Sequence, residues 1–252
     1  MEHSRDIEEE PLIQRLEGAE EGPGSSVKIT EPSPSDRKDS QKEKEKRIMC
    51  GLLVKRDTTW LNIAVMPLLP FVSGTINFYS TTFLPLLLQH DDYFAIQESE
   101  LGKATAVVII WAALLPLILT PFLTYLFETV GRRIPVSYAL LSSNVLFWVM
   151  PKVAPNFTLL CVIRAFIGLN NTILIGAPLI SDYIKQESRG KAVALSALFL
   201  GLSQVFATQF LIPFTAKMTY DESFGYTALI LLTLTIPAIF MIREPSPKRD
   251  NI

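Results

Sequence analysis

Residues 104–127 read ATAVVIIWAALLPLILTPFLTYLF, a stretch without a single charged side chain. At 1.5 Å per residue, a helix of this length measures about 36 Å, which exceeds the ~30 Å of hydrocarbon in a bilayer. A helix on the surface of a soluble domain would instead carry polar residues along one face. The stretch therefore predicts a membrane-spanning helix.

Comparable charge-free runs occupy residues 58–90, 134–151, 165–181, 192–216 and 223–242. Together with the first run they favour an all-α membrane protein whose transmembrane domain covers residues 58–243, followed by a short tail at 244–252. The six predicted spans are roughly 60–88, 104–127, 134–151, 157–181, 192–214 and 223–242.

Residues 1–57 have a different composition, because they hold 25 of the chain's 48 charged side chains. They are rich in Glu, Lys, Ser and Pro and cannot bury enough apolar surface to offset the entropy of ordering, so we expect a disordered cytosolic tail. Within it, Glu8 precedes Leu12 and Ile13 in a pattern similar to the acidic dileucine signals that sorting adaptors bind on endosomal, lysosomal and vacuolar membrane proteins. The alternative is a chance pair of apolar residues in an acidic tail.

The distribution of lysine and arginine predicts the orientation, because basic residues near span ends stay on the cytosolic side. With a cytosolic N-terminus, fourteen of them lie inside and three outside, which predicts six spans with both termini in the cytosol. The inner set is Lys42, Lys44, Lys46, Arg47, Lys55, Arg56, Arg132, Arg133, Lys185, Arg189, Lys191, Arg243, Lys248 and Arg249. The outer set is Lys103, Lys152 and Lys217.

The composition argues against other classes of protein. A net charge of −2 and a pI near 5.8 provide no basic field for nucleic acid. The sequence has two cysteines and two histidines, with no spacing typical of a metal site and no acidic cluster typical of a membrane-embedded catalytic centre. We therefore expect no enzymatic activity, no catalytic residue, no metal and no cofactor.

Polar side chains inside the spans are the candidates for a substrate site, because each is costly in hydrocarbon. Arg164 and Asn171 are seven residues apart and share one face of the fourth span. Asn77 belongs to a polar ladder in the first span, and Gln204 lies on a polar face of the fifth, which suggests a shared aqueous cavity. The alternative is that these groups only join helices by hydrogen bonds. No carboxylate lies inside a span, so we expect the partner of Arg164 to be solvent, substrate or a group outside the sequence.

Small residues at spacing four, Gly168, Thr172 and Gly176, form a stripe beside this polar face. Such stripes let two helices approach closely, so we expect a neighbouring helix to pack there.

Four segments resemble the signatures of one transporter family. Residues 124–133 read TYLFETVGRR, and residues 164–168 read RAFIG. Asp182 is followed by Arg189 and a glycine, and residues 244–248 read EPSPK. All four occur in order, at the spans and on the sides where the major facilitator superfamily carries similar motifs. The chain therefore resembles the amino-terminal six-helix half of that family.

The resemblance implies a secondary transporter that works by alternating access, with a 3+3 inverted repeat in each six-helix half. It further implies that a small solute binds at the midplane between this half and a second one, which comes from the same chain type or from a separate chain. It also implies a cytosolic salt-bridge gate formed by Glu128, Gly131, Arg132, Arg133, Asp182 and Arg189. The spans contain no acid, and the stretch from Gly201 to Phe210 in the fifth span has no proline, unlike the Gly-Pro motif of the family's drug antiporters. Facilitated diffusion or coupling through a partner half is therefore favoured over drug/proton exchange. The alternative is a truncated, non-transporting relative that acts as an accessory or sorting protein.

Overall fold

The computed structural model describes residues 48–49, 51–55, 58–176 and 179–243. Residues 1–47 and 244–252 lie outside the described residues. The expected tail and its candidate sorting signal at Glu8, Leu12 and Ile13 therefore remain predictions.

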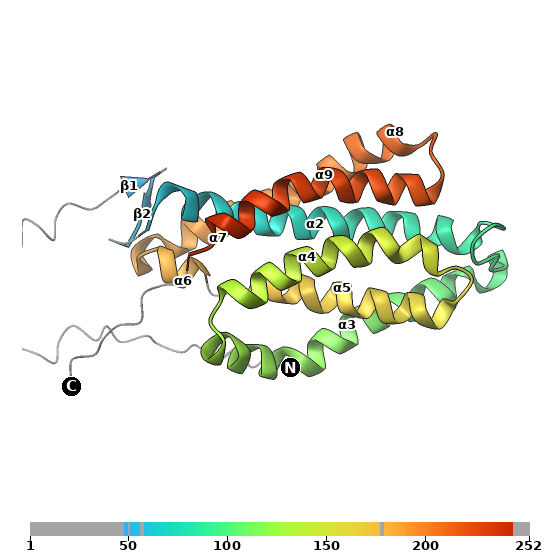
Figure 1. Cartoon of the computed structure of the whole chain (residues 1–252), viewed down its shortest axis with the longest axis horizontal. Helices are drawn as coiled ribbons and strands as arrows, with labels where there is room; N and C mark the ends of the chain where they lie inside the picture. Colours follow the sequence, from blue (N-terminus) through green and yellow to red (C-terminus); the bar gives the residue numbers. More distant parts are fainter. Residues whose placement is uncertain (1–47, 50, 56–57, 177–178, 244–252) are drawn as a thin grey trace, which may run out of the picture. The chain divides into compact units, whose positions relative to one another are not determined.

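Six long helices lie side by side in one bundle (Figure 1). They are α2 (Trp60–Gln89), α3 (Glu98–Thr129), α4 (Arg133–Val149), α5 (Phe157–Gly176), α7 (Arg189–Phe206) and α9 (Tyr220–Met241). Shorter elements extend or join them: η1 (Met150–Val153), α6 (Leu179–Tyr183), η2 (Gln186–Ser188), the π-helical turn η3 (Ala207–Leu211) and α8 (Ile212–Thr215). Within the described part of the chain, six helical segments are long and apolar enough to cross a membrane, which confirms the predicted fold class.

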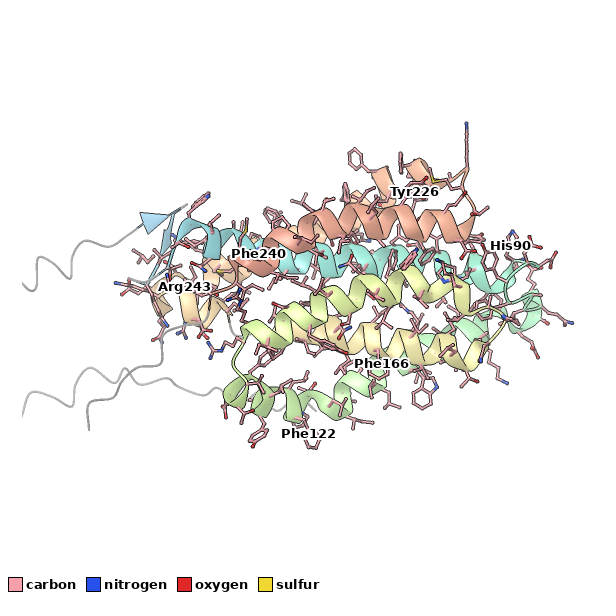
Figure 2. The ribbon with its side chains drawn as sticks, viewed as in Figure 1. His90, Phe122, Phe166, Tyr226, Phe240 and Arg243 are labelled. Carbon is pink, nitrogen blue, oxygen red and sulfur yellow. The ribbon has the colours of Figure 1, made fainter. Side chains whose placement is uncertain are left out.

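Helix α2 forms the centre of the bundle. It packs against α7, α9, α5 and α3, and 67% of its most apolar stretch is buried, compared with 11% for α3. Helix α3 packs along α5, and α4 lies between α5 and α9. Large apolar side chains such as Phe122, Phe166 and Phe240 are exposed on the bundle surface (Figure 2), as expected for helices that face lipid.

Two glycines set the closest helix contacts. The α-carbon of Gly168 in α5 faces the backbone carbonyl of Ala112 in α3, and a Cβ at this position would overlap that carbonyl. A Cβ on Gly74 in α2 would overlap the side chains of Ser203 and Leu200 in α7. No atom of the described residues lies within 4 Å of the position of a Cβ on Gly176, so of the two glycines in the predicted stripe Gly168 is the one in close helix contact.

Residues 48–49 and 51–55, which we assigned to the tail, are ordered. Strand β1 (Ile48–Met49) pairs antiparallel with β2 (Leu52–Leu53), and Gly51 between them has a φ of 74° that favours glycine. We refer to residues 52–55 as the strap. Its Val54 is 1% exposed and forms an antiparallel bridge with Ile184, in the loop after α6.

The backbone attaches the strap firmly to that loop. The amide of Lys185 donates to Leu53 O at 2.9 Å, and the amide of Lys55 donates to Tyr183 O at 2.9 Å. The amide of Leu53 donates to Ser188 Oγ at 3.1 Å. Each of these bonds satisfies a backbone group that would otherwise need water, so the strap is part of the folded domain.

His90 and Arg243 lie at opposite ends of the bundle (Figure 2), which we call the His90 end and the Arg243 end. At the Arg243 end the first and last helices are joined, because Asn62 Nδ2 donates to Met241 O at 2.9 Å. Asn62 also accepts from the amide of Thr59 at 3.0 Å and thereby caps α2.

Candidate functional site

Arg164 lies in the interior of the bundle, seven residues into α5, and is 3% exposed. Its guanidinium donates to the hydroxyls of two neighbouring residues of α2. One bond reaches Ser80 Oγ, and the other reaches Thr81 Oγ1 at 3.1 Å. Because the side chain of Thr81 is exposed, the guanidinium lies directly behind a surface position of α2.

The charge of Arg164 has no anionic partner among the described residues. The side chain forms no ion pair there, and its Nε has no hydrogen-bond partner. Hydroxyl groups can share hydrogen bonds with a guanidinium but cannot neutralise its charge. The site is therefore electropositive in a low-dielectric environment, where a bound anion would be strongly favoured.

The predicted polar ladder of the first span meets the fourth span at two levels. Ser73 Oγ donates to the side-chain oxygen of Asn171, and Thr81 contacts Arg164. Asn77 lies between these two contacts on α2 and is partly exposed. The structure thus places Asn77, Arg164 and Asn171 along a single α2–α5 seam.

Gln204 is placed differently. Its side chain is exposed on α7, and no hydrogen bond in the described part of the chain joins it to Arg164 or Asn171. The polar face of the fifth span instead approaches α2 through Ser203, which is fully buried against Gly74.

Sequence reasoning missed several buried polar contacts. Asn170 Nδ2 donates to Ser142 Oγ at 2.9 Å, which ties α5 to α4. Asn144 Nδ2 donates to Thr235 Oγ1 at 3.0 Å and ties α4 to α9. The sequence offered one indication of both contacts, namely that Asn170 and Asn144 are amide side chains within charge-free runs. Only the packing shows that they join helices, whereas Asn171 faces α2.

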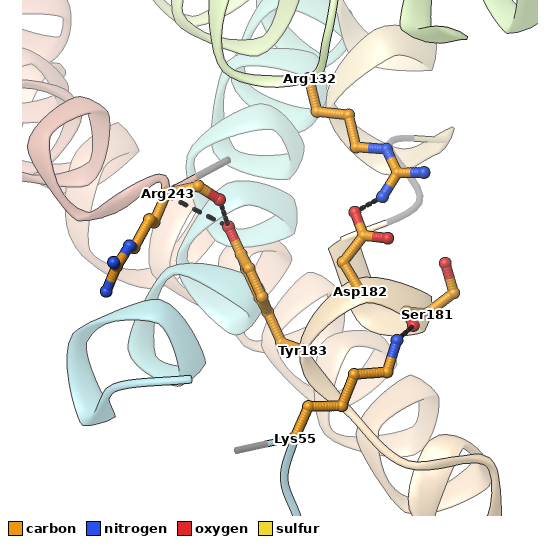
Figure 3. A network of polar contacts seen from close by, with 6 residues as sticks. All are labelled: Lys55, Arg132, Ser181, Asp182, Tyr183 and Arg243. Atoms are coloured by element: carbon orange, nitrogen blue, oxygen red, sulfur yellow. Dashed lines mark hydrogen bonds and ion pairs between the residues drawn. The ribbon is translucent and has the colours of Figure 1, made fainter. Parts of the chain in front are cut away.

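At the Arg243 end, the short helix α6 joins three separate parts of the chain (Figure 3). Asp182 forms an ion pair with Arg132, which lies in the turn between α3 and α4. Lys55 Nζ of the strap donates to Ser181 O at 2.7 Å, and Tyr183 Oη donates to Arg243 O, just after α9, at 2.6 Å. We call Lys55, Arg132, Asp182, Tyr183 and Arg243 the α6 cluster.

The α3–α4 turn has the geometry that its sequence predicts. Gly131 adopts a φ of 86°, a conformation that most side chains disfavour, and this turn presents Arg132 to Asp182. Glu128 and Arg133 are exposed on either side of the turn. Arg189 begins α7 and is half-buried, and its Nε has no hydrogen-bond partner among the described residues.

We expect Asp182→Asn to lower Tm by about 2–6 °C, because Arg132 would lose a carboxylate partner that is only 10% exposed, a cost of about 1–2 kcal/mol. Thermal unfolding of the full chain in lipid nanodiscs measures the shift. Glu128→Gln, which removes an exposed carboxylate from the same end, should change Tm by less than about 1 °C. Equal shifts for the two variants would show that the ion pair contributes nothing to stability.

The His90 end contains a cavity of about 680 Å³ between α2, α8 and α9. Its polar lining includes Asp92, Asp221 and Tyr93, whose hydroxyl donates to Asp221 at 3.5 Å, and none of the described residues that line it is a lysine or an arginine. Burial raises the pKa of Tyr93, so this group stays protonated at neutral pH. The cavity therefore has the opposite electrostatic character to the Arg164 site.

Comparison with known families agrees with this arrangement. A family model described as Major Facilitator Superfamily matches residues 30–252, which is most of the chain. No curated protein and no solved structure matches the chain. With six helices of spanning length and a family match over nearly their whole extent, the chain belongs to the major facilitator superfamily of membrane transporters.

Proposed function

We propose that the protein moves a small anionic solute across a membrane by alternating access and that Arg164 is the anchor for this solute. The observation that carries the proposal is a buried guanidinium whose partners in the described structure are the hydroxyls of Ser80 and Thr81, without a carboxylate. A charge retained at this depth without a counter-ion is costly, and binding an anion would offset that cost.

The solute site extends along the α2–α5 seam. Arg164 supplies the charge through a planar fork suited to carboxylate or phosphate, and Asn77 and Asn171 supply amide groups for neutral polar atoms. The solute approaches from the exposed side of Thr81. Gln204 of α7 takes part only when a conformational change or a second half brings its exposed side chain toward the seam.

A second six-helix half completes the site, with the solute held between the two halves near the midplane. The exposure of Thr81 and the partial exposure of Asn77 support this, because polar groups at this depth are otherwise expected to be covered by protein or water. This second half comes from the same chain type or from a separate one.

The α6 cluster acts as a gate on the cytosolic side. Arg132 and Asp182 form its central ion pair, and Gly131 shapes the turn that presents Arg132. The exposed Glu128 and Arg133, together with Arg189, extend the gate toward the second half. Since no carboxylate lies inside the spans, the transport step runs by facilitated diffusion or takes its coupling from the partner half.

The Arg243 end faces the cytosol, and so do both termini. The excess of lysine and arginine in the segments assigned to this end supports the orientation. The Glu8, Leu12 and Ile13 pattern would then be available to sorting adaptors that direct the protein to an endosomal, lysosomal or vacuolar membrane. Modification of a single cysteine introduced near Arg133 by an impermeant reagent added only from outside the cell would contradict this orientation.

A non-transporting accessory or sorting role is the second candidate, and the dileucine-like pattern favours it. In that case Leu12→Ala with Ile13→Ala would change the location of the protein, and the purified protein would bind no solute.

The direct test is a ligand screen on the full chain in nanodiscs. Small carboxylates, phosphate esters and sulfate should raise Tm in a saturable manner, because a ligand that binds only the folded state stabilises it, by about 2.7 kcal/mol at one hundred times its Kd. Size-matched amines and neutral polyols at equal ionic strength should give no saturable shift. A response to cations or neutral solutes alone would contradict the anion assignment.

A further inference from the structure

A groove of about 670 Å³ runs along the bundle surface between α4 and α9, away from the α2–α5 seam. Its apolar walls include Val145 and Leu229, which are 56% and 58% exposed. Gly225 leaves the groove open, because a Cβ at this position would lie 3.4 Å from the indole nitrogen of Trp148. Acyl chains of the bilayer can therefore enter a gap that a larger residue would fill.

Charged side chains of both signs gather at one end of this groove. Lys152 places its Nζ 3.9 Å from the centre of the Trp148 ring, and Asp221 and Glu222 begin α9 across from it. Glu222 Oε2 accepts from the amide of Thr219 at 3.1 Å, which fixes this carboxylate in place. Lys152, Asp221 and Glu222 belong to the His90 end of their helices, where lipid headgroups would lie.

This pattern is complementary to a headgroup that carries both charges. A phosphate can pair with Lys152 while an ammonium group a few ångströms away pairs with Asp221 or Glu222. A purely anionic headgroup would gain the lysine but would face two carboxylates. Trp148 and Tyr226 line the same end, and such aromatic residues favour the interfacial layer of a bilayer.

We propose that the α4–α9 groove is a binding site for one zwitterionic phospholipid, with the phosphate at Lys152, the ammonium group at Asp221 and Glu222, and an acyl chain along Val145 and Leu229. The site is independent of the proposed solute site, since neither Arg164 nor any other residue of the α2–α5 seam lines the groove.

A second groove provides an internal control. It has a volume of about 450 Å³, lies between α3 and α5, and is lined by Trp111, Phe166 and other uncharged residues. Trp111 and Trp148 are 49% and 47% exposed, so they are nearly equal reporters of lipid contact. The sequence has three tryptophans, and two single-tryptophan proteins can therefore report the two grooves separately.

The test reconstitutes these two proteins into vesicles of phosphatidylethanolamine and phosphatidylglycerol, with brominated acyl chains on one lipid at a time. Bromine quenches tryptophan fluorescence on contact. Because the two lipids carry the same brominated acyl chains, a difference in quenching between them reflects the headgroup and not the depth of the tryptophan in the bilayer. We expect phosphatidylethanolamine to be enriched about threefold over its bulk fraction at Trp148, as an exposed charge pair would produce, and not at Trp111. Lys152→Gln should reduce this enrichment, and Gly225→Leu should abolish it.

Three results would overturn the proposal. Equal enrichment at Trp111 and Trp148 would mean that only ordinary boundary lipid is present. Enrichment of phosphatidylglycerol at Trp148 would show that the headgroup is recognised as an anion. Full enrichment of phosphatidylethanolamine at Trp148 in both Lys152→Gln and Gly225→Leu would place the lipid elsewhere. Lys152→Gln changes only an exposed side chain, so this variant is expected to fold.

Discussion

Replacement of Arg164 by glutamine should weaken the Tm response to anions by more than about tenfold and at the same time stabilise the unliganded protein. A charge-assisted hydrogen bond to an anion contributes about 1.5–3 kcal/mol, which corresponds to a factor of ten or more in Kd. Removal of a buried charge without a counter-ion recovers its desolvation cost, so we expect Tm to rise by about 3–8 °C. Both quantities come from the same thermal unfolding experiment in nanodiscs.

Asn144→Ala is the matched control for the Arg164 variant. It also removes a buried polar side chain, but one whose hydrogen bond joins α4 to Thr235 of α9. It should lower Tm and leave the Kd for anions unchanged. Arg164→Lys keeps the charge without the planar fork and should retain part of the affinity. An unchanged anion response in Arg164→Gln would remove the basis of the proposed function.

Gly168→Ala should lower Tm by about 6–12 °C, the largest loss of stability that we expect from a single methyl group. The added Cβ would overlap the carbonyl of Ala112, and a backbone atom cannot move aside as a side chain can. Overpacking at such a contact costs about 3 kcal/mol, because α3 and α5 must separate along their interface. Thermal unfolding of the purified variant measures the loss.

Gly176→Ala makes the same chemical change in the same helix, where no atom of the described part of the chain lies within 4 Å of the new Cβ. This control should be neutral or slightly stabilising, because alanine is the better helix former. If both variants lost stability equally, the cause would be the helix backbone and not the close contact with α3.

The sequence predicted the six spans because each rests on about twenty consecutive residues, whose summed transfer energy favours the membrane. The hydrogen-bond partners of the polar side chains inside the spans were harder to predict. Asn170 and Asn171 are adjacent in the sequence, yet the first joins α4 and the second joins α2. A helix rotates by 100° per residue, and only the packing of neighbouring helices decides which partner each amide meets.

The ion pair of Arg132 and Asp182 followed from the family resemblance, because both residues lie in recognisable motifs. The strap did not, for a physical reason. Four residues are too few to show a hydrophobic period within a charged, proline-containing segment. Part of what holds the strap is a set of backbone hydrogen bonds that any residue except proline can form, beside the burial of Leu52 and Val54. Composition averaged over residues 1–57 therefore could not reveal that the strap is folded.

The five residues of α6 receive contacts from both the first and the last segments of the described chain. If a protein that binds the N-terminal tail also shifts the strap and thereby alters the Arg132–Asp182 contact, thermodynamic linkage requires that a solute acting on the same contact changes the affinity for that protein by the same factor. Recruitment by a cytosolic partner and occupancy by cargo would then report on each other through one helical turn and a half.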